Sequence, residues 1–543
     1  MAEVNYQGPS PLGGLNENGL SPARQRAIFF ASFMTLIAAG IGFAVRGGIL
    51  ADWGAEFGFT KSDLGVLFGA GLAGFGVTII FFSFFADTVG YRALLLLAFV
   101  LLILSAVITL AASPIYHSHG QHACYWTLYI GTFVFSLAQG LCEAAINPLT
   151  ATLFPKNKTH YLNILHAGWP GGLMIGGLIN YLFATKGAKV AHVQWEILAS
   201  IYLLPTLYFG FVTLKEKFPI SEAKAAGISL GQMIGAVLAP MLLFLFLIHA
   251  MVGYVELGTD GWIQNILNNT MGATASLLFT YCSIVMFILR FFAGPIVHKI
   301  NPLGLLCIAA TCGAIGLYFL GSPKTGVIIW AAATIFAIGK SFYWPTMLGV
   351  IGERFPRGGA LAMGLSGGIG MLSAGFLGGP GIGYTQDYNA SHNLQASAPA
   401  AYDRVKADKP NQFLAFPAIQ GLNGQKVDVI GDEGATLKSD LAKKPTDESL
   451  VSLNTWYTTV EKPHVTADAK PVGEAVIYGG RKALQVTSLV PVTMAGCYLL
   501  LVVYFIARGG YKAVHLDSSG REIEVAHTAS EEDAIEAAGT QQA

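Results

Sequence analysis

Ionisable and amide side chains occur at a helical spacing inside a long apolar stretch, residues 125–153. The segment GLCEAAINP places Glu143 and Asn147 four residues apart, directly before Pro148. In a helix this spacing puts the carboxylate and the amide on one face. A carboxylate at the centre of a bilayer costs about 2.5–3.5 kcal/mol. We therefore expect Glu143 to bind a proton or to pair with a buried cation, and not to face lipid.

A second segment, AIGKSFYWP, has the same layout with a cation in place of the acid. Lys340 stands five residues before a proline, as Glu143 does, and VRGG and VELG give a looser match that contains Arg46 and Glu256. Each half of the chain then carries one acid and one base. We expect two charge-compensated pairs, Arg46 with Glu143 and Glu256 with Lys340, around a central cavity. The pairs either are static salt bridges or rearrange when a solute or a proton binds.

The elements that must position these residues are membrane spans. The chain has 543 residues, of which 53% are hydrophobic and 12% charged, with 65 glycines, and its mean hydropathy is +0.54. A span needs about 20 apolar residues. The sequence predicts twelve spans, at residues 27–50, 63–85, 93–112, 125–153, 162–184, 193–214, 232–255, 270–297, 303–320, 327–351, 360–383 and 483–507. The formal net charge of zero gives no general attraction to nucleic acid.

Lys and Arg are distributed unevenly between the two sets of loops. They concentrate at residues 24–26, 156–158, 215–224 and 354–357, whereas the opposite short loops hold Lys61, Lys186, Lys189 and Lys324. The first set is expected to be cytoplasmic. This orientation places residues 387–480 outside.

These observations divide the chain into segments. We predict a cytoplasmic tail (1–26), a six-helix half (27–214), a cytoplasmic linker (215–231), helices 7–11 (232–386), an extracytoplasmic loop (387–480), helix 12 (481–508) and a cytoplasmic tail (509–543). The loop contains short strand-like runs such as residues 426–430, and the tail from His515 is acidic and expected to be disordered.

The loop after the second span resembles a motif of the major facilitator superfamily. Residues 83–92, SFFADTVGYR, keep its Asp87, Gly90 and Arg92, and a weaker copy begins at Gly294 after the eighth span. Arg290, just upstream, also fits the pattern. The resemblance implies an all-α membrane protein with twelve transmembrane helices in two pseudo-symmetric six-helix halves. Asp87, Arg92 and Arg290 are then expected to gate it, since a carboxylate at a helix end can meet an Arg or a helix N-terminus.

The fourth and fifth spans resemble the fucose–proton symporter family of sugar transporters. That family carries Glu-x-x-x-Asn-Pro and Leu-Asn-x-x-Gln, which match residues 143–148 and, in part, LNILH at 162–166. The resemblance implies that Glu143 is a coupling carboxylate and that Asn163 and His166 lie at the sugar. Two departures are His166 in place of glutamine and Arg46 near the place of an acid on helix 1. Such an Arg could draw an anionic solute.

Sugars bind to amides and to aromatic faces, and these types supply the remaining candidates. The predicted solute-binding residues are Asn163, His166, Gln139, Asn147, Trp169, Tyr343, Trp344, Lys340 and Glu256, and the predicted coupling residues are Glu143 and Arg46.

The function predicted from these residues is secondary transport of a small polar solute, a sugar, coupled to protons, by a monomer in the inner cell membrane. Two alternatives remain open: a transporter of organic anions or sugar acids, and a transporter-like nutrient receptor. The sequence contains no phosphate loop, metal-ligand cluster or nucleophile–base pair. We therefore expect neither an enzyme nor a cofactor.

Overall fold

The computed structural model describes residues 19–59, 61–183, 193–271, 274–322, 326–516 and 520–526. Lys186, Lys189 and Lys324, which entered the orientation argument, lie outside these residues, as do most of the N-terminal tail and the acidic stretch after Ala526. The first half contains α1 (Pro22–Phe57), α2 (Lys61–Ser83), α3 (Ala86–Val89), α4 (Tyr91–Leu110), α5 (Ala112–Leu153), η1 (Pro155–Asn157), α6 (Lys158–Phe183), α7 (Trp195–Ser200) and α8 (Leu203–Lys215).

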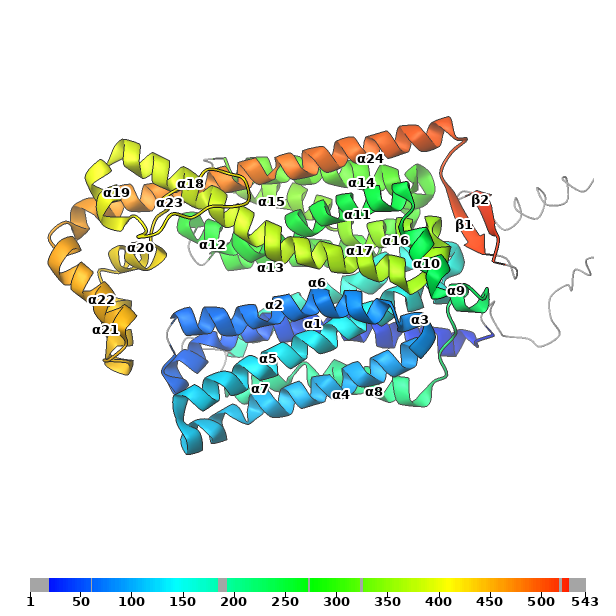
Figure 1. The fold of residues 1–543 in the computed structure, drawn as a ribbon, viewed down its shortest axis with the longest axis horizontal. Helices are drawn as coiled ribbons and strands as arrows, with labels where there is room; N and C mark the ends of the chain where they lie inside the picture. The colour runs from blue at the N-terminus through cyan, green and yellow to red at the C-terminus, as the bar shows by residue number, and fades with distance from the viewer. Residues whose placement is uncertain are drawn as a thin grey trace, which may run out of the picture.

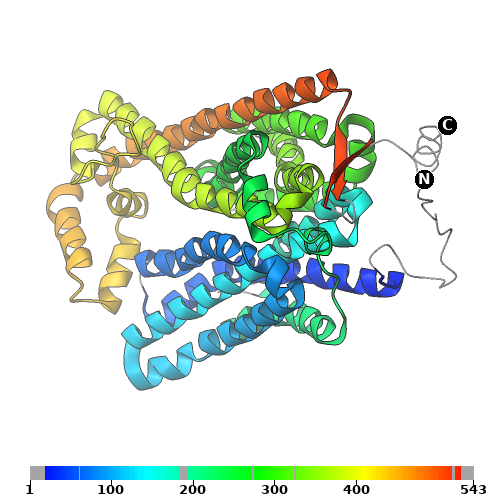
Figure 2. The same cartoon turned by 45° about the vertical axis from the view of Figure 1, so that its right-hand side comes forward.

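The second half follows a short linker helix, α9 (Glu222–Ala225). It contains α10 (Leu230–Val237), α11 (Pro240–Gly253), η2 (Tyr254–Gly258), α12 (Thr259–Met271), α13 (Thr274–Arg290), α14 (Ala293–Leu320), α15 (Val327–Lys340), α16 (Tyr343–Arg354), η3 (Pro356–Gly358), α17 (Gly359–Ser373), η4 (Ala374–Gly378), α18 (Gly379–Ser397), α23 (Val465–Thr487) and α24 (Leu489–Ala507). Figures 1 and 2 show the first half in blue and cyan beside the second in green to red.

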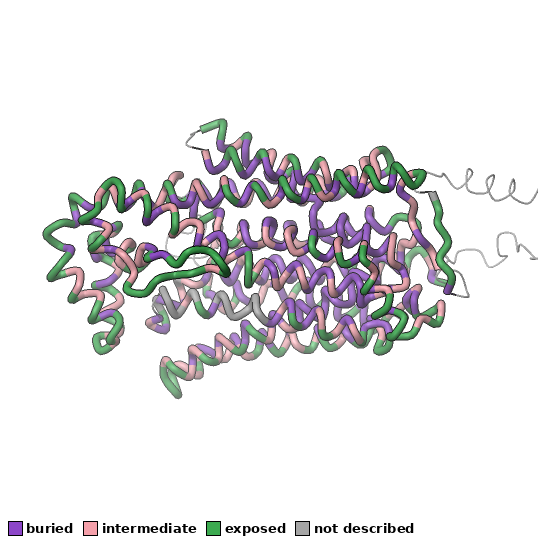
Figure 3. Tube along the Cα trace, turned by 45° about the horizontal axis from the view of Figure 1, so that its top comes forward, coloured by how far each residue is buried: buried purple, intermediate pink, exposed green. Residues whose placement is uncertain are grey.

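Each predicted span coincides with one helix or with a few consecutive helices. Nine of the described helical segments are long and apolar enough to cross a bilayer. The helices α2, α6 and α13 occupy the other three predicted places. Exposed apolar side chains lie on the outer helices, for example Leu204 on α8, Leu247 on α11 and Val503 on α24. Figure 3 shows buried residues concentrated inside the bundle. The chain is a multi-pass integral membrane protein.

The same helix pairs pack in both halves. The contacts of α1 with α6, α4 with α5, and α4 with α8 recur as α11 with α17, α14 with α15, and α14 with α24. Between the halves, α2 packs on α17 and α6 packs on α13. The two halves are therefore related by a pseudo-two-fold axis, as the repeated motifs predicted.

Glycines allow one of these pairs to approach very closely. A Cβ on Gly253 of α11 would overlap the carbonyl oxygen of Gly370 of α17, and a Cβ on Gly258 would lie 2.8 Å from the Cα of Gly378. Small residues permit such backbone contact between membrane helices. At this contact both helices form a π-helical turn, η2 and η4. Such turns are frequent at functional sites.

The segment 387–480, which we call the cap, is folded and helical. Its elements are the end of α18, α19 (Pro399–Val405), α20 (Gly424–Gly431), α21 (Ala435–Lys443), α22 (Glu448–Trp456), η5 (Tyr457–Glu461) and the start of α23. The strand-like interpretation of residues 426–430 is wrong. Asn423 caps α20 by accepting from the Lys426 N–H, and Ile430 packs into a small core with Leu394 and Val472.

The tail after α24 is partly folded, so the expected disorder from His515 is wrong for residues 515–516 and 522–526. Strands β1 (Lys512–Leu516) and β2 (Glu522–Ala526) form an antiparallel hairpin. Arg354 of α16 donates to the Lys512 carbonyl at 2.6 Å and contacts Glu524 at 3.2 Å. The hairpin lies at the end of the bundle opposite the cap (Figure 1). We call this the linker end.

Candidate functional site

A cavity of about 330 Å³ lies between the two halves. Its wall comes from α1, α2, α5 and α6 on one side and from η2, α12, α13, α17, η4 and α18 on the other. Aromatic rings dominate, with a few polar groups among them. The lining residues that matter below are Arg46, Thr132, Phe135, Gln139, Trp169, Asp260 and Trp262.

Two polar groups in the cavity wall lack hydrogen-bond partners. The Gln139 amide nitrogen and the Thr132 hydroxyl are buried, and neither finds an acceptor or donor in the described part of the chain. Buried polar groups are normally satisfied, so such exceptions need an explanation. Both lie on α5, and Trp169 of α6 lines the same cavity, which makes it suitable for a ligand with hydroxyl groups and an apolar face.

Arg46 lies in the same wall but does not pair with Glu143. Its guanidinium lies over the Phe135 ring, 3.7 Å from the centroid, and donates to the Ser105 hydroxyl at 3.4 Å. The Tyr202 ring centroid is 5.6 Å away. The predicted Arg46–Glu143 pair is wrong, because the side chain of Arg46 packs among the aromatic rings of its own half.

Glu143 forms a polar chain with the two residues that the motif places beside it. Its Oε2 accepts from the Asn147 amide at 2.7 Å, and the Asn147 carbonyl oxygen lies 2.9 Å from His166 Nε2. The carboxylate and the amide are on one helical face, as their spacing predicted, and α6 supplies the histidine. The three side chains are buried on α5 and α6.

In the second half the charges are paired, but not as predicted. Glu256 binds Arg290 at 3.1 Å, and Lys340 binds Asp260 at 2.6 Å. The predicted Glu256–Lys340 pair is wrong because each charge has a closer partner. Asp260 was missed, although it follows Glu256 by four residues, because the apolar span was taken to end at residue 255.

Arg290 occupies a central position that the gating prediction did not anticipate. Its Nε donates to the Ser341 carbonyl at 2.8 Å, and its Nη1 donates to the His166 carbonyl at 2.5 Å. Proline lacks an N–H, so it leaves the carbonyl four residues earlier without a helical partner. Pro345 frees Ser341 in this way, and Pro170 frees His166. One guanidinium therefore satisfies a freed carbonyl in each half and joins them deep inside the bundle.

Three of the predicted solute-binding residues point elsewhere. The Tyr343 hydroxyl donates to the Ala309 carbonyl at 3.1 Å, behind the cavity. Trp344 meets His249 edge-to-face, with ring centroids 4.7 Å apart. Asn163 donates to the Thr346 hydroxyl at 3.1 Å and so connects α6 to α16. Of the nine predicted solute-binding residues, Gln139 and Trp169 line the cavity. These three do not, and neither do His166, Asn147, Lys340 and Glu256.

Polar contacts close the linker end between the two halves. Asp87 accepts from the Ala360 N–H at 3.0 Å, at the start of α17, which is the helix N-terminus that favours an anion. The Thr159 hydroxyl donates to Glu353 at 2.6 Å. Arg92, in contrast, donates to the carbonyl groups at the end of α8, so it ties its own half together.

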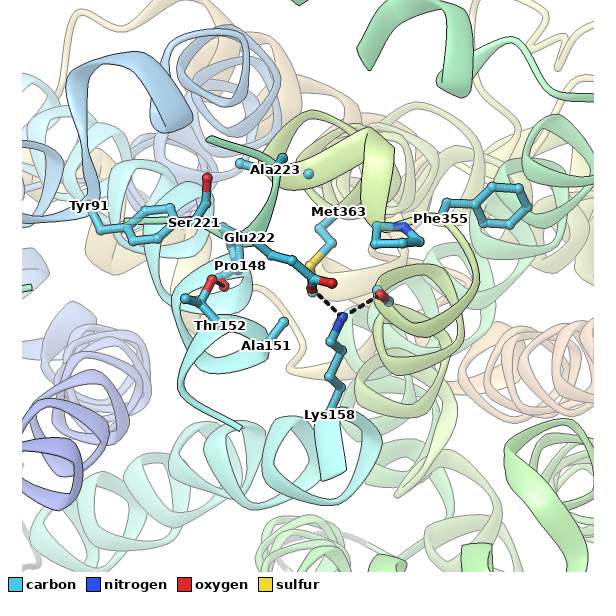
Figure 4. Close-up of a pocket in the computed structure, with 14 residues that line it drawn as sticks. Tyr91, Pro148, Ala151, Thr152, Lys158, Ser221, Glu222, Ala223, Phe355 and Met363 are labelled. Atoms are coloured by element: carbon cyan, nitrogen blue, oxygen red, sulfur yellow. Dashed lines mark hydrogen bonds and ion pairs between the residues drawn. The ribbon is translucent and has the colours of Figure 1, made fainter. Parts of the chain in front are cut away.

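The linker enters this closure through Glu222. Lys158 of the first half binds Glu222 at 2.9 Å and donates to the Gly352 carbonyl at 3.1 Å, as the dashed lines in Figure 4 show. The hairpin adds two further contacts. Leu516 N–H donates to Glu222 at 3.1 Å, and the Tyr511 hydroxyl donates to Glu353 at 2.9 Å.

At the cap end the halves are joined differently. The cap is carried by the second half, and Lys443 of α21 donates to the Gly54 carbonyl of α1 at 3.4 Å. The polar closure described above is at the opposite end, so the cavity is separated from the linker end by closely packed polar side chains.

Comparisons with known proteins give the family and the fold. A sequence profile of the Major Facilitator Superfamily matches residues 28–379, and a search of curated proteins found no match. The structure is similar to the proton:xylose symporter XylE bound to 6-bromo-6-deoxy-D-glucose (15% identity, TM-score 0.57, 68% of this chain and 91% of that one). It is also similar to the transporter FucP in the outward conformation (17% identity, TM-score 0.53, 67% of this chain and 92% of that one). A third similar structure is the human organic anion transporter MFSD10 (12% identity, TM-score 0.50, 66% of this chain and 93% of that one).

Proposed function

Because the chain belongs to the Major Facilitator Superfamily, we propose that it is a secondary transporter that moves a small polyhydroxylated solute, a sugar, across the membrane by alternating access. The observation that carries this proposal is the cavity between the halves. It combines the Gln139 amide and Thr132 hydroxyl, which have no partner among the described residues, with the Trp169 ring. Hydroxyl groups of a sugar would satisfy the first two, and its C–H face would pack on the third.

Closure at the linker end supports alternating access. Asp87, Thr159 and Lys158 hold the halves together through contacts that cross between them or reach the linker. Opening toward that side requires these contacts to break while the solute remains bound to cavity residues from both halves. The similar FucP structure is in the outward conformation, and the closed linker end here corresponds to such a state.

The Lys and Arg distribution favours a cytoplasmic linker end and an extracytoplasmic cap, in the inner cell membrane. The linker, the hairpin and the polar closure then face the cytoplasm. We infer that one chain is the transporting unit, because residues of its two halves together line a cavity.

Proton coupling is assigned to Glu143. Its carboxylate lies in a buried polar chain with Asn147 and His166, and Arg290 acts on it through space from α13. The carbonyl of His166 is held by Arg290, which spans both halves. A proton bound at Glu143 would therefore change the electrostatics at the point where the halves are joined.

The experiment is uptake and counterflow of labelled hexoses in liposomes that contain the purified protein. Gln139→Ala removes one hydrogen-bonding group and Trp169→Phe reduces the aromatic face, so each should weaken solute binding, by roughly tenfold for Gln139→Ala and by up to tenfold for Trp169→Phe. Trp126→Phe is the matched control, because Trp126 is exposed outside the cavity. Binding without counterflow would instead favour a nutrient receptor. Equal effects of the two tryptophan changes would contradict solute binding in this cavity.

One observation favours a second function, the transport of organic anions. Arg46 places in the cavity wall a cation that forms no ion pair within the described residues, and one protein of similar fold is an organic anion transporter.

A further inference from the structure

Six charged side chains, three of each sign, come from the described segments α1, α5, η2, α12, α13 and α15 at the cavity or near the contact between the halves. Four of them form the pairs Glu256–Arg290 and Asp260–Lys340. The other two are Arg46 and Glu143, both on the first half. Among the described residues, no opposite charge forms an ion pair with either one.

The surroundings of Arg46 suit an anion from outside the protein. A guanidinium has five N–H donors in a planar fork that matches a carboxylate. Within the described part of the chain, Arg46 donates to the Ser105 hydroxyl, interacts with the Tyr202 hydroxyl and packs on the Phe135 ring. It lines the cavity and keeps 7% of its surface exposed. The remaining donors are available to a ligand that enters the cavity.

The sum of the six charges limits what can bind at low cost. With Glu143 ionised the sum is zero, and a proton on Glu143 leaves one uncompensated positive charge. A net charge buried in low dielectric is costly, whereas a compensated set is tolerated. A solute with one carboxylate restores the sum to zero when the proton binds, but a neutral sugar does not.

We propose that the transported solute carries one carboxylate, as a sugar acid does, that this carboxylate binds Arg46, and that each solute enters together with one proton held by Glu143. This inference rests on the proposed transport function and specifies its substrate class. Asn147 on the same helix, His166 on α6 and Arg290 on α13 are the polar and charged groups that face Glu143.

The transport cycle balances in charge and protons. From the cap end the solute anion and one proton enter, the proton binds a Glu143 carboxylate oxygen, and both leave at the linker end. No net charge crosses the membrane. A neutral hexose taken up with the same proton would carry one positive charge across.

The experiment compares solutes that differ only in the carboxylate at C6: D-galactose with D-galacturonate, and D-glucose with D-glucuronate. The purified full-length protein in liposomes is supplied with each solute under an inward proton gradient, and uptake and charge movement are recorded. At least one uronate should bind more than tenfold better than its hexose, accumulate, and produce no current. Accumulation of a hexose with a current, or equal binding of both members of each pair, would overturn the inference but leave the proposed transport function intact.

Substitutions of Arg46 test whether the solute carboxylate binds to this residue. Arg46→Gln should lower uronate affinity at least tenfold and hexose affinity by much less, while Arg46→Lys should retain part of the preference. Unchanged uronate binding in Arg46→Gln would overturn the assignment. The current measurement on the unaltered protein decides the charge balance even if Arg46→Gln does not fold. Absence of counterflow for every solute would overturn the transport proposal, and this inference with it.

Discussion

The two halves share a fold and a set of helix contacts, but they handle their buried charges differently. In the second half each membrane-embedded charge has a partner of opposite sign, at 3.1 Å for Glu256–Arg290 and 2.6 Å for Lys340–Asp260. In the first half Arg46 contacts a hydroxyl and aromatic rings, and Glu143 contacts an amide.

This difference suggests a division of labour between repeats of common origin. Paired charges are structural, because removing one partner leaves the other unpaired in low dielectric. Charges with neutral partners can gain a proton or a counter-ion without breaking an ion pair. The charges of the second half then have a structural role, and the first half carries the groups whose charge changes during transport.

The sharpest test of this comparison is the loss of one arginine from each half. Arg290→Ala should lower the free energy of unfolding by about 3–5 kcal/mol, because Glu256 is left unpaired, and two freed carbonyls also lose their donor. Arg46→Gln removes a charge that forms no ion pair among the described residues and should cause a smaller loss. Thermal unfolding of the detergent-purified variants measures both effects. Equal destabilisation by the two changes would break the comparison.

A smaller effect is expected from the other ion pair. Lys340→Gln and Asp260→Asn should each destabilise the protein, and the double variant should recover part of the loss, with a coupling energy of up to about 3 kcal/mol. The same double-mutant cycle on Arg46 and Glu143 should give a smaller coupling, because no ion pair joins the two side chains. A large Arg46–Glu143 coupling would show that these two residues form an ion pair in another state.

The smallest expected effect is on the pH dependence of the transport rate, to which two glutamates with different surroundings should contribute differently. Burial alone would raise the pKa of Glu222, but the Lys158 ammonium and its hydrogen bond, with that of Leu516 N–H, hold the pKa below its usual 4.5. The contribution of Glu222 to closure is therefore present at neutral pH and is lost only as the pH falls through that lowered pKa.

Glu222→Gln should accordingly slow or speed transport without changing the shape of its pH profile between about pH 5 and pH 8. Glu143→Gln should flatten the profile, retain solute exchange and abolish accumulation driven by a proton gradient. Initial rates of uptake and exchange across this pH range provide the measurement. A profile that depends on Glu222 and not on Glu143 would move proton coupling from the Glu143–Asn147–His166 chain to the linker end.

Sequence reasoning predicted the elements better than the contacts between them. Twenty-residue apolar runs identify membrane helices because lipid offers no hydrogen-bond partners, so the backbone must form its hydrogen bonds within each span. The spacing of Glu143 and Asn147 also predicted their contact, since both lie on one helix. Whether Arg46 meets Glu143 depends on how Phe135 and Ser105 pack around a long side chain, which no local pattern encodes.

The same reason explains the missed contacts of Arg290 and Asp260. Pro345 and Pro170 leave the carbonyl groups of Ser341 and His166 without a helical donor, but the arginine that binds them comes from another helix. Asp260 lies just beyond an apolar run, where composition suggests a loop, although η2 and α12 continue the helix. In the cap, alternating Val427 and Val429 favoured a strand, and the Asn423 cap with local packing produced a helix.

The hairpin also affects the order in which the molecule assembles during translation. Lys158 and Glu222 are synthesised before the second half, so their contact can form early. The contacts of Tyr511 with Glu353 and of Leu516 with Glu222 join residues made after α24 to residues made much earlier. Domains fold progressively as the chain emerges. The contacts at the linker end are therefore complete only after α24 has left the ribosome. A nascent chain that has inserted its helices thus passes through a stage in which the halves are docked but less firmly closed.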